Sequence, residues 1–273
     1  MTIESTQSTG FLDRAKKLAK RNLPPKAIDN LRRVKRSLTD FGYPITIPIQ
    51  TGELSYMLTV GNRHEDGEAR GRYSERDFIL QILNHTRPGN VYCDIGAAIG
   101  THTIPIALGS PNCKVFSLEP DFNVADALGH NIGLNGITNV SIFQIAAGNY
   151  DGIAILHTDG RPGMAPEITE QHKKPNGIFR QHIPMIVRRL DSLVLGNTIP
   201  APDIIKIDVE GAGMDVLAGL GYLRPRDIFM EVHPGRGEEL CQVDQLLRGR
   251  GYIMLMNKPR GGEIHTHFQL GLE

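Results

Sequence analysis

Residues 91–101 read Val91-Tyr-Cys-Asp94-Ile-Gly96-Ala-Ala-Ile-Gly100-Thr101, a short apolar run that passes into a turn of small residues. We predict that the run is a buried strand and that a helix follows it at residues 102–108. In parallel α/β sheets, ligands bind outside the carboxyl ends of the strands. Gly96 and Gly100 lack a Cβ, so the backbone of the turn can pass close to a ligand. The stretch therefore predicts a ligand-binding turn at Asp94–Gly100.

The chemistry of this turn argues against a dinucleotide. Ala98 occupies the middle glycine position of the Gly-x-Gly-x-x-Gly fingerprint, where a pyrophosphate approaches the backbone. Asp94 repels phosphates and attracts an ammonium group. Glu119 follows a second predicted strand, and a carboxylate there can accept hydrogen bonds from both ribose hydroxyls. Together the two acids favour a shorter nucleoside ligand such as S-adenosylmethionine. The alternative is that both are strand-end residues that meet solvent.

Apolar strands alternate with helices over the rest of the chain. The predicted strands are residues 114–118, 140–145, 203–208 and 227–231, and the predicted helices are residues 121–136, 214–220 and 238–247. This alternation predicts an α/β fold, with a parallel sheet covered by helices on both faces. The last two predicted strands, residues 252–256 and 264–270, are joined by a connection too short for a helical crossover. We therefore expect them to be antiparallel.

The N-terminal part has a different pattern. Two amphipathic helices are predicted within residues 11–38, with Pro24-Pro25 between them. A β-hairpin follows over residues 44–60 and turns at Thr51-Gly52, and a helix capped by Ser74 is predicted at residues 74–84. We divide the chain into an N-terminal extension of helices and hairpin, residues 1–70, and a ligand-binding domain, residues 71–273.

The segment from His157 to Met185 shows little periodicity and is rich in Gly, Pro, His and Lys. We predict a long loop there. A long loop in a compact domain is usually functional or disordered. Two interpretations stay open: a mobile insertion, or a lid over the substrate.

Several motifs together resemble the FkbM-type methyltransferase family. They are Val91–Gly100, Val115-Phe-Ser-Leu-Glu-Pro120, Leu190-Asp-Ser-Leu193 and Ile205-Lys-Ile-Asp-Val-Glu-Gly211, and the resemblance covers about residues 72–270. It implies a class I methyltransferase sheet, which is Rossmann-like with an antiparallel last strand. It also implies methyl transfer from S-adenosylmethionine, usually to a hydroxyl of a sugar, glycan or small natural product. We assign donor binding to nine residues: Asp94, Gly96, Ala97, Gly100, Thr101, Glu119, Pro120, Ala146 and Asp208.

The sequence departs from the family pattern at two positions. Ala98 stands where the family commonly has Asn, which removes a side chain near the donor. Gly213 stands where the family commonly has Glu. If that Glu caps a helix or contacts the substrate, this chain lacks its contribution.

Candidate catalytic residues lie at the ends of the fourth and fifth predicted strands. Lys206, Asp208 and Glu210 alternate along one extended stretch, and Glu231 and His233 share a face of the next. Asp208, Glu231 and His233 can contact the acceptor or take its proton, since an unperturbed imidazole titrates near pH 6.5. For Lys206 the alternative is a structural salt bridge with an acid. Asp208, Glu210, Glu231 and His233 can also hold a divalent metal, which we leave unassigned.

Two alternative functions remain beside the methyltransferase. A non-catalytic module that binds an adenosyl nucleoside fits the Gly213 departure. An NAD-dependent oxidoreductase would need the glycine that Ala98 replaces, and it explains an antiparallel sheet end poorly. Binding of the donor without turnover would favour the first alternative.

Composition sets further limits. The 273 residues carry no formal net charge, so the whole molecule has no field that attracts nucleic acid. Residues 11–36 are basic and permit weak contact with an anionic membrane surface or a partner, although a solvated helical face is the more common reason. We find neither a signal peptide nor a membrane span. Three cysteines without metal-ligand spacing fit the reducing cytoplasm, where we expect the protein to act.

Overall fold

A computed structural model of the chain describes residues 40–71, 75–158, 167–170, 175, 179 and 181–271. Contacts divide the chain into two compact units, Met1–Tyr43 and Pro44–Glu273. The second unit includes the hairpin that we assigned to the N-terminal extension. The predicted helices within residues 11–38 and the predicted cap Ser74 lie outside the described residues. The division at residue 70 stays a prediction.

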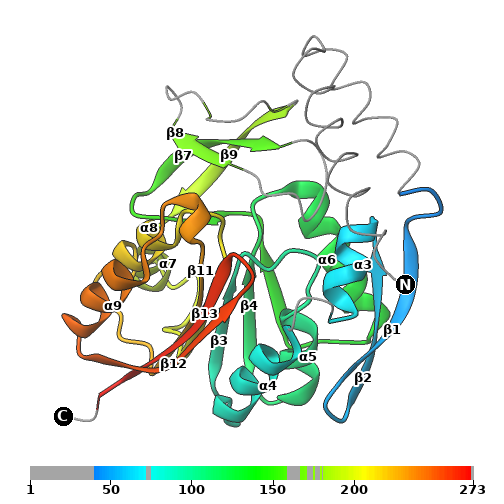
Figure 1. The fold of residues 1–273 in the computed structure, drawn as a ribbon, viewed down its shortest axis with the longest axis horizontal. Coiled ribbons are helices and arrows are strands. Elements are labelled where there is room, and N and C mark those ends of the chain that lie inside the picture. The colour runs from blue at the N-terminus through cyan, green and yellow to red at the C-terminus, as the bar shows by residue number, and fades with distance from the viewer. Residues whose placement is uncertain are drawn as a thin grey trace, which may run out of the picture. The chain divides into compact units, whose positions relative to one another are not determined.

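Seven strands form the main sheet (Figure 1). Their spatial order is β12 (Tyr252–Arg260), β13 (Glu263–Leu270), β11 (Asp227–Val232), β10 (Ile204–Ile207), β3 (Val91–Ile95), β4 (Lys114–Leu118) and β5 (Val140–Phe143). The five strands from β11 to β5 are parallel, while β13 runs antiparallel to both β11 and β12. The predicted parallel sheet with an antiparallel end is confirmed.

Helices pack on both faces of this sheet, because alternate side chains of each buried strand face opposite cores. One core joins Tyr92 of β3 to Phe78 and Ile106, which lie on α4 (Glu75–His85) and α5 (Thr103–Gly109). The second core joins Cys93, the next residue of β3, to residues of three helices. These are α7 (Leu190–Leu195), α8 (Gly213–Ala218) and α9 (Leu240–Arg248).

The predicted hairpin is also present, as β1 (Ile45–Thr51) and β2 (Leu54–Val60). Two asparagines of α6 (Phe122–Leu134, with Asn135 as its C-cap) hold it. The Asn135 side chain accepts from the Met57 N–H at 2.8 Å and donates to the Met57 carbonyl at 2.7 Å. The Asn131 side chain does the same with Thr59, at 2.8 and 3.1 Å. A short helix, α3 (Arg63–Ala69), follows the hairpin and was not predicted.

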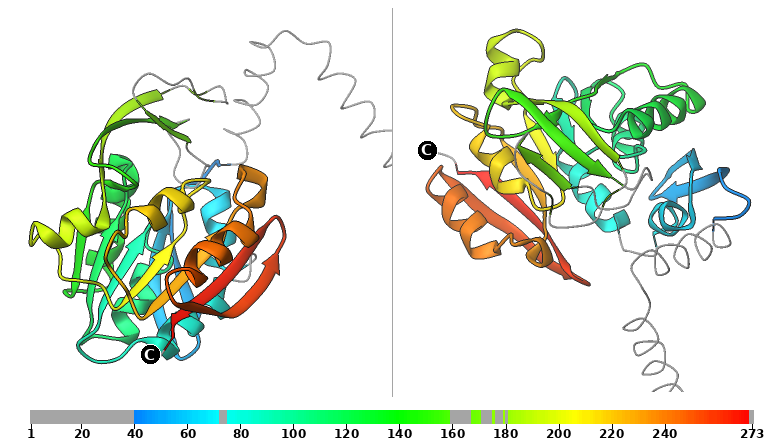
Figure 2. Two further views of the ribbon diagram at one scale, coloured as in Figure 1. Left: turned by 90° about the vertical axis from the view of Figure 1, so that its left-hand side faces the viewer. Right: turned by 90° about the horizontal axis from the view of Figure 1, so that it is seen from above.

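The predicted loop over His157–Met185 is wrong at residues 157–158, 167–170 and 181–185, which lie in strands. These residues belong to a second sheet of four strands, in the order β6 (Ala146–Ala147), β9 (Gln181–Arg188), β7 (Gly152–Thr158) and β8 (Glu167–Glu170). Figures 1 and 2 show it as a layer of its own above the main sheet. Ala154, Leu156, Met185 and Val187 form its small core. The strands form because distant segments pair, which local periodicity does not reveal.

Candidate functional site

The candidate site lies at the carboxyl ends of β3, β4, β10 and β11. Ile95, Leu118 and Ile207 occupy one row across three neighbouring strands. The residues that follow them therefore meet at one edge of the sheet. These residues are the predicted turn, Glu119 and Asp208, and His233 follows the next strand.

The turn packs directly against the backbone after β10. Gly96 has a φ of +76°, and a Cβ there would lie 1.9 Å from the carbonyl oxygen of Asp208. Glycine is therefore required for both its conformation and its size. Gly100 has a φ of +99°, where a Cβ would meet Leu128 at 2.8 Å. Both glycines that the sequence singled out permit this tight turn.

Lys206 is a buried cation between the two halves of the site. Its Nζ lies 3.1 Å from Asp94 Oδ1 and 3.4 Å from Asp208 Oδ2, and it donates to the Gly96 carbonyl at 2.8 Å. Burial alone lowers the pKa of the ammonium, but Asp94 and Asp208 outweigh burial and hold the pKa above its usual value. Asp94 Oδ2 accepts a further hydrogen bond from Thr103 at 2.6 Å. Asp94 therefore pairs with Lys206. This is the structural salt bridge that the sequence analysis gave as the alternative role of Lys206.

Glu119 is buried after β4 and joins the glycine turn to the start of α6. One carboxylate oxygen accepts from the Ala98 N–H and the other from the Asp121 N–H, both at 3.0 Å. Burial raises the pKa of Glu119 to about 7, against the effect of these two hydrogen bonds. Each oxygen keeps a further lone pair, so the carboxylate can accept two more hydrogen bonds.

Ala98 has a φ of +48°, a left-handed conformation that alanine adopts at a cost of about 1–2 kcal/mol. Asn and Gly tolerate this region better, which gives the family's usual Asn a physical reason. We expect Ala98→Gly to stabilise the protein by about 1 kcal/mol. In thermal unfolding the midpoint should rise by roughly 2–4 °C. Ala125→Gly inside the right-handed helix α6 is the control, and it should lower the midpoint. A lower unfolding midpoint in both variants would contradict the assignment of backbone strain to Ala98.

The side chains of Asp208, Glu231 and His233 lie together at the ends of β10 and β11. His233 Nε2 lies 3.6 Å from Glu231 Oε1 and 3.8 Å from Asp208 Oδ1. Burial raises the pKa of Glu231 well above its usual range, and the charge of Asp208 adds to this effect. Burial also raises the pKa of Asp208, but Lys206 and His233 outweigh it and the net direction is downward. Burial lowers the pKa of His233, but Glu238 and Asp208 outweigh it and the net direction is upward.

A further group of polar residues, most of them buried, adjoins these three, and the sequence analysis did not find it. Arg260 pairs with Glu75 and lies 3.3 Å from Glu231 Oε1, while His265 Nε2 lies 3.1 Å from Glu231 Oε2. His102 Nε2 lies 3.3 Å from Glu75. These residues come from α4, from the residue before α5, and from β12 and β13.

Glu68 of α3 also belongs to the electrostatic environment of the site. Burial and then the charge of Asp208 raise the pKa of Glu68 to about 8. A helix of the hairpin region therefore brings an acid toward the carboxyl end of β10. The sequence carried one signal for this helix. Asn62 accepts from the N–H groups of His64 and Glu65, and Glu65 accepts from the N–H of Gly61, the residue before the N-cap. The spacing Asn-x-x-Glu is similar to that of a capping box.

The departure at Gly213 has a steric explanation. A Cβ at Gly213 would lie 2.3 Å from Met230 Cε and 2.8 Å from Glu238 Oε1. Glu238 is buried and accepts from the Gly213 N–H at 2.6 Å and from the His233 N–H at 2.9 Å. An acid at the start of α8 is thus supplied by Glu238, from a different segment of the chain.

The other predicted site residues are placed as follows. Glu210 forms an ion pair with Arg236 at 3.1 Å and is exposed. The remaining predicted donor residues lie in the turn, after β4 and on β6, and they are Ala97 (buried), Thr101 (half-buried), Pro120 (half-buried) and Ala146 (buried).

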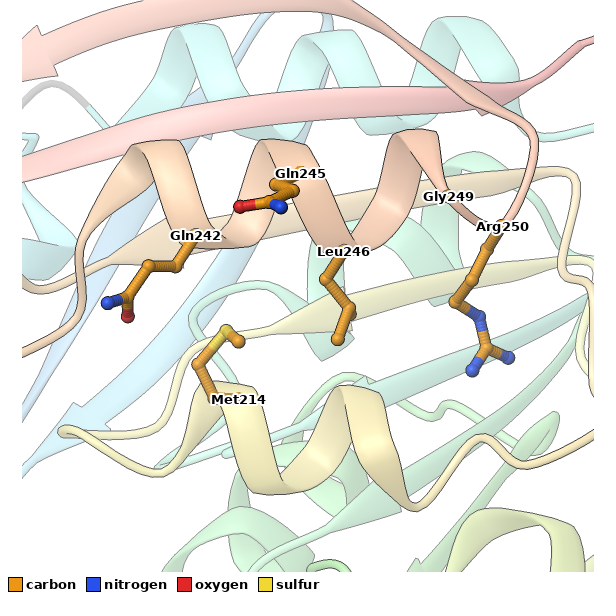
Figure 3. Close-up of a pocket in the computed structure, with 6 residues that line it drawn as sticks. All are labelled: Met214, Gln242, Gln245, Leu246, Gly249 and Arg250. Atoms are coloured by element: carbon orange, nitrogen blue, oxygen red, sulfur yellow. The ribbon is translucent and has the colours of Figure 1, made fainter.

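A separate open groove of about 540 Å³ lies between α8 and α9 (Figure 3). Its six lining residues are Met214, Gln242, Gln245, Leu246, Gly249 and Arg250. They include no acid and no histidine, so this groove offers no group that could take a proton at neutral pH. The strand ends therefore remain the candidate site.

The order of the strands and the glycine turn after β3 are those of a class I S-adenosylmethionine-dependent methyltransferase. Residues 94–254 match the methyltransferase FkbM domain, and the chain belongs to this family.

Three relatives show how wide the similarity is. A hexuronic acid methyltransferase of Haloferax volcanii is 25% identical, over 65% of this chain and 70% of the relative. The 31-O-demethyl-FK506 methyltransferase FkbM of Streptomyces tacrolimicus is 29% identical, over 73% of this chain and 88% of the relative. The 2-O-methyltransferase NoeI of Sinorhizobium fredii is 26% identical, over 52% of this chain and 60% of the relative.

Proposed function

We propose that the protein transfers the methyl group of S-adenosylmethionine to a hydroxyl of a sugar, glycan or small natural product. The observation that carries the proposal is the meeting of Glu119 and Asp208 at one sheet edge, with His233 3.8 Å from Asp208. The names of the relatives support a hydroxyl acceptor, since they include O-methylation and a hexuronic acid.

On the donor side, we propose that Glu119 accepts hydrogen bonds from the two ribose hydroxyls, while the glycine turn lets the nucleoside lie against the backbone. The turn is fixed before the donor arrives, because Glu119 holds the Ala98 N–H and Lys206 holds the Gly96 carbonyl. Prior ordering of this kind lowers the entropy lost on binding.

On the acceptor side, we propose that Asp208, Glu231 and His233 bind the reacting hydroxyl next to the donor. Methyl transfer is an in-line displacement, so the enzyme mainly aligns the acceptor oxygen with the methyl carbon. The hydroxyl must also lose its proton, and Asp208 and His233 are groups that can assist. Lys206 and Glu210, also considered from the sequence, are held in ion pairs instead.

The proposal also includes the cellular location, which we propose is the cytoplasm. No helix in the described ranges is both long enough and apolar enough to cross a membrane. Cys93, Cys113 and Cys241 are free thiols, which fits our prediction of a reducing cytoplasm. Surface association through the basic N-terminus stays a prediction, because those residues lie outside the described part.

The experiment is turnover on a panel of hydroxylated sugars and natural products, with S-adenosylhomocysteine as the measured product. We expect His233→Asn to lower kcat at least about 100-fold, the usual loss when assistance to proton transfer is removed. The affinity for S-adenosylhomocysteine should stay unchanged. His130→Asn, on the exposed face of α6, is the control and should retain turnover.

Two results would count against this function. Donor binding without turnover on any acceptor of the panel would favour a non-catalytic nucleoside-binding module. Binding of NAD in place of S-adenosylhomocysteine would favour the oxidoreductase.

A further inference from the structure

We propose that Glu238 is a positioning residue for methyl transfer: it holds the proton of the neutral His233 ring on Nδ1 and so leaves Nε2 open to take the proton of the acceptor hydroxyl. The inference rests on the proposed function, because it concerns the base that the proposed reaction needs. In this role Glu238 acts through His233, and not directly on the donor or the acceptor.

The first argument is the way in which the chain closes between the two residues. After β11 it passes through a short 3₁₀ helix, η1 (Pro234–Arg236), and turns back at Gly237, which has a φ of +86°. The Glu238 N–H donates to the His233 carbonyl at 3.3 Å, and Glu238 Oε2 accepts from the His233 N–H at 2.9 Å. These two hydrogen bonds close the loop on itself, so the carboxylate has a fixed place beside the ring.

The second argument is that the two ring nitrogens of His233 face different groups. Nδ1 lies 3.5 Å from Glu238 Oε2, while Nε2 faces Glu231 at 3.6 Å and Asp208 at 3.8 Å. Nδ1 is buried and has no hydrogen-bond partner among the described residues, although buried polar groups normally have one. Catalytic hydrogen bonds are often long before the substrate binds and shorten in the reactive complex. Glu238 is thus placed to accept from Nδ1, and Nε2 points to the strand ends where we place the acceptor.

The third argument is that the Glu238 carboxylate is built into the fold. The residue is only 2% exposed, and its Oε1 accepts from the Gly213 N–H at 2.6 Å. A Cβ at Gly213 would lie 2.8 Å from this oxygen, so the glycine makes room for the carboxylate. In the part of the chain that the structure describes, His233 is the cationic side chain with which Glu238 pairs. The charge of Glu238 is therefore available to the ring.

The chemistry of the transfer explains why such a carboxylate matters. The acceptor oxygen bonds to the methyl carbon while the carbon–sulfur bond of the sulfonium breaks, and the electron pair of that bond stays on sulfur. The hydroxyl proton passes to His233 Nε2, so the positive charge lost from the sulfonium appears on the imidazolium, which later releases the proton to water. A carboxylate on the far nitrogen fixes the tautomer of an imidazole and stabilises this cation. Burial lowers the pKa of His233, but Glu238 and then Asp208 outweigh burial, as this role requires.

The first test reads the tautomer in the full-length wild-type protein, with and without S-adenosylhomocysteine, by NMR of ¹⁵N-labelled histidine. We expect the neutral His233 ring to carry its proton on Nδ1. The signals of this ring are identified by their absence from the spectrum of His233→Asn. A neutral ring that carries its proton on Nε2 would overturn the inference.

The second test is Glu238→Gln. The new amide can donate to Nδ1, which places the ring proton on Nε2 and removes the base. We expect kcat to fall at least about tenfold, with the KM for S-adenosylmethionine unchanged. The acidic limb of the pH profile of kcat/KM should move to lower pH, because the carboxylate no longer raises the pKa of His233. The other acids that act on the ring, Asp208, Glu231 and Glu210, are the same in both proteins.

The matched control is Asp203→Asn, at the opposite end of β10. Asp203 Oδ2 accepts from the Val91 N–H at 2.8 Å, so this variant also removes a carboxylate that holds a backbone N–H. It should lower the midpoint of thermal unfolding and leave the His233 tautomer and the pH profile unchanged. A Glu238→Gln protein with the kcat and pH profile of the wild type would overturn the inference.

The two proposals fail in different ways. Absence of turnover in a wild-type protein whose His233 ring is protonated on Nδ1 would count against the proposed function, while the arrangement of the ring would stand. Turnover by a wild-type protein whose ring is protonated on Nε2 would overturn the role of Glu238 and leave the proposed function in place.

Discussion

We expect Glu119→Ala to weaken S-adenosylhomocysteine binding about 100-fold. The carboxylate would accept two ribose hydroxyls in addition to the two N–H groups that it already holds. A hydrogen bond to a charged group contributes about 1.5–3 kcal/mol, so the loss of two amounts to at least about 3 kcal/mol. Isothermal titration calorimetry with S-adenosylhomocysteine, and with NAD as a comparison ligand, measures the effect.

The pH dependence of the same titration gives a second readout. Burial raises the pKa of Glu119 to about 7, so the carboxyl is mostly neutral at pH 6 and mostly ionised at pH 8. The ionised form is the better acceptor, and affinity should therefore rise about tenfold from pH 6 to pH 8. Glu119→Gln should remove this rise. Glu239→Ala, an exposed acid, should leave both affinity and pH dependence unchanged. A Glu119→Ala protein that is folded and binds normally would refute the donor site.

We expect Lys206→Met to destabilise the folded protein by about 3–5 kcal/mol. The substitution leaves the fully buried Asp94 and the partly exposed Asp208 without the cation that pairs with both. Removing one partner of a buried ion pair leaves an uncompensated charge, which is the reason for a loss of this size. The midpoint of thermal unfolding should fall by roughly 6–20 °C.

The control for Lys206 is a surface ion pair. Arg248 and Asp244 pair at 2.8 Å on α9, but the Arg248 side chain is 59% exposed. Arg248→Ala should therefore cost less than about 1 kcal/mol. Equal midpoints for the two variants would mean that Lys206 does not stabilise the turn and the strand ends.

Local patterns predicted much of the main sheet. The apolar run before Asp94 and the glycines after it are adjacent in sequence, so strand and turn could be recognised together. The antiparallel end could be predicted because Asn257–Glu263 is too short for a crossover helix. The second sheet could not be predicted in this way, because β9 contains Pro184 and pairs with segments well before it in the chain.

The site was predicted only where its residues follow the predicted strands. Asp208 and His233 do so, and the sequence analysis therefore named them as candidates, which they remain. Glu68 lies on a seven-residue helix, Arg-His-Glu-Asp-Gly-Glu-Ala, which has no apolar stripe to mark it. Arg260 and His265 reach the site because β12 and β13 form a hairpin that places them beside Glu231. Side chains brought together only by tertiary contacts leave no local pattern.

The amides of Asn131 and Asn135 have a consequence for how this protein behaves in concentrated solution. A strand edge with free N–H and C=O groups can pair with another chain and start aggregation. The two asparagine side chains form hydrogen bonds with the outward-facing N–H and C=O groups of Met57 and Thr59, as a neighbouring strand would. The helix α6 thus protects the β2 edge of the hairpin. With its N–H and C=O groups at Met57 and Thr59 already bonded, this edge is a poor template for self-association.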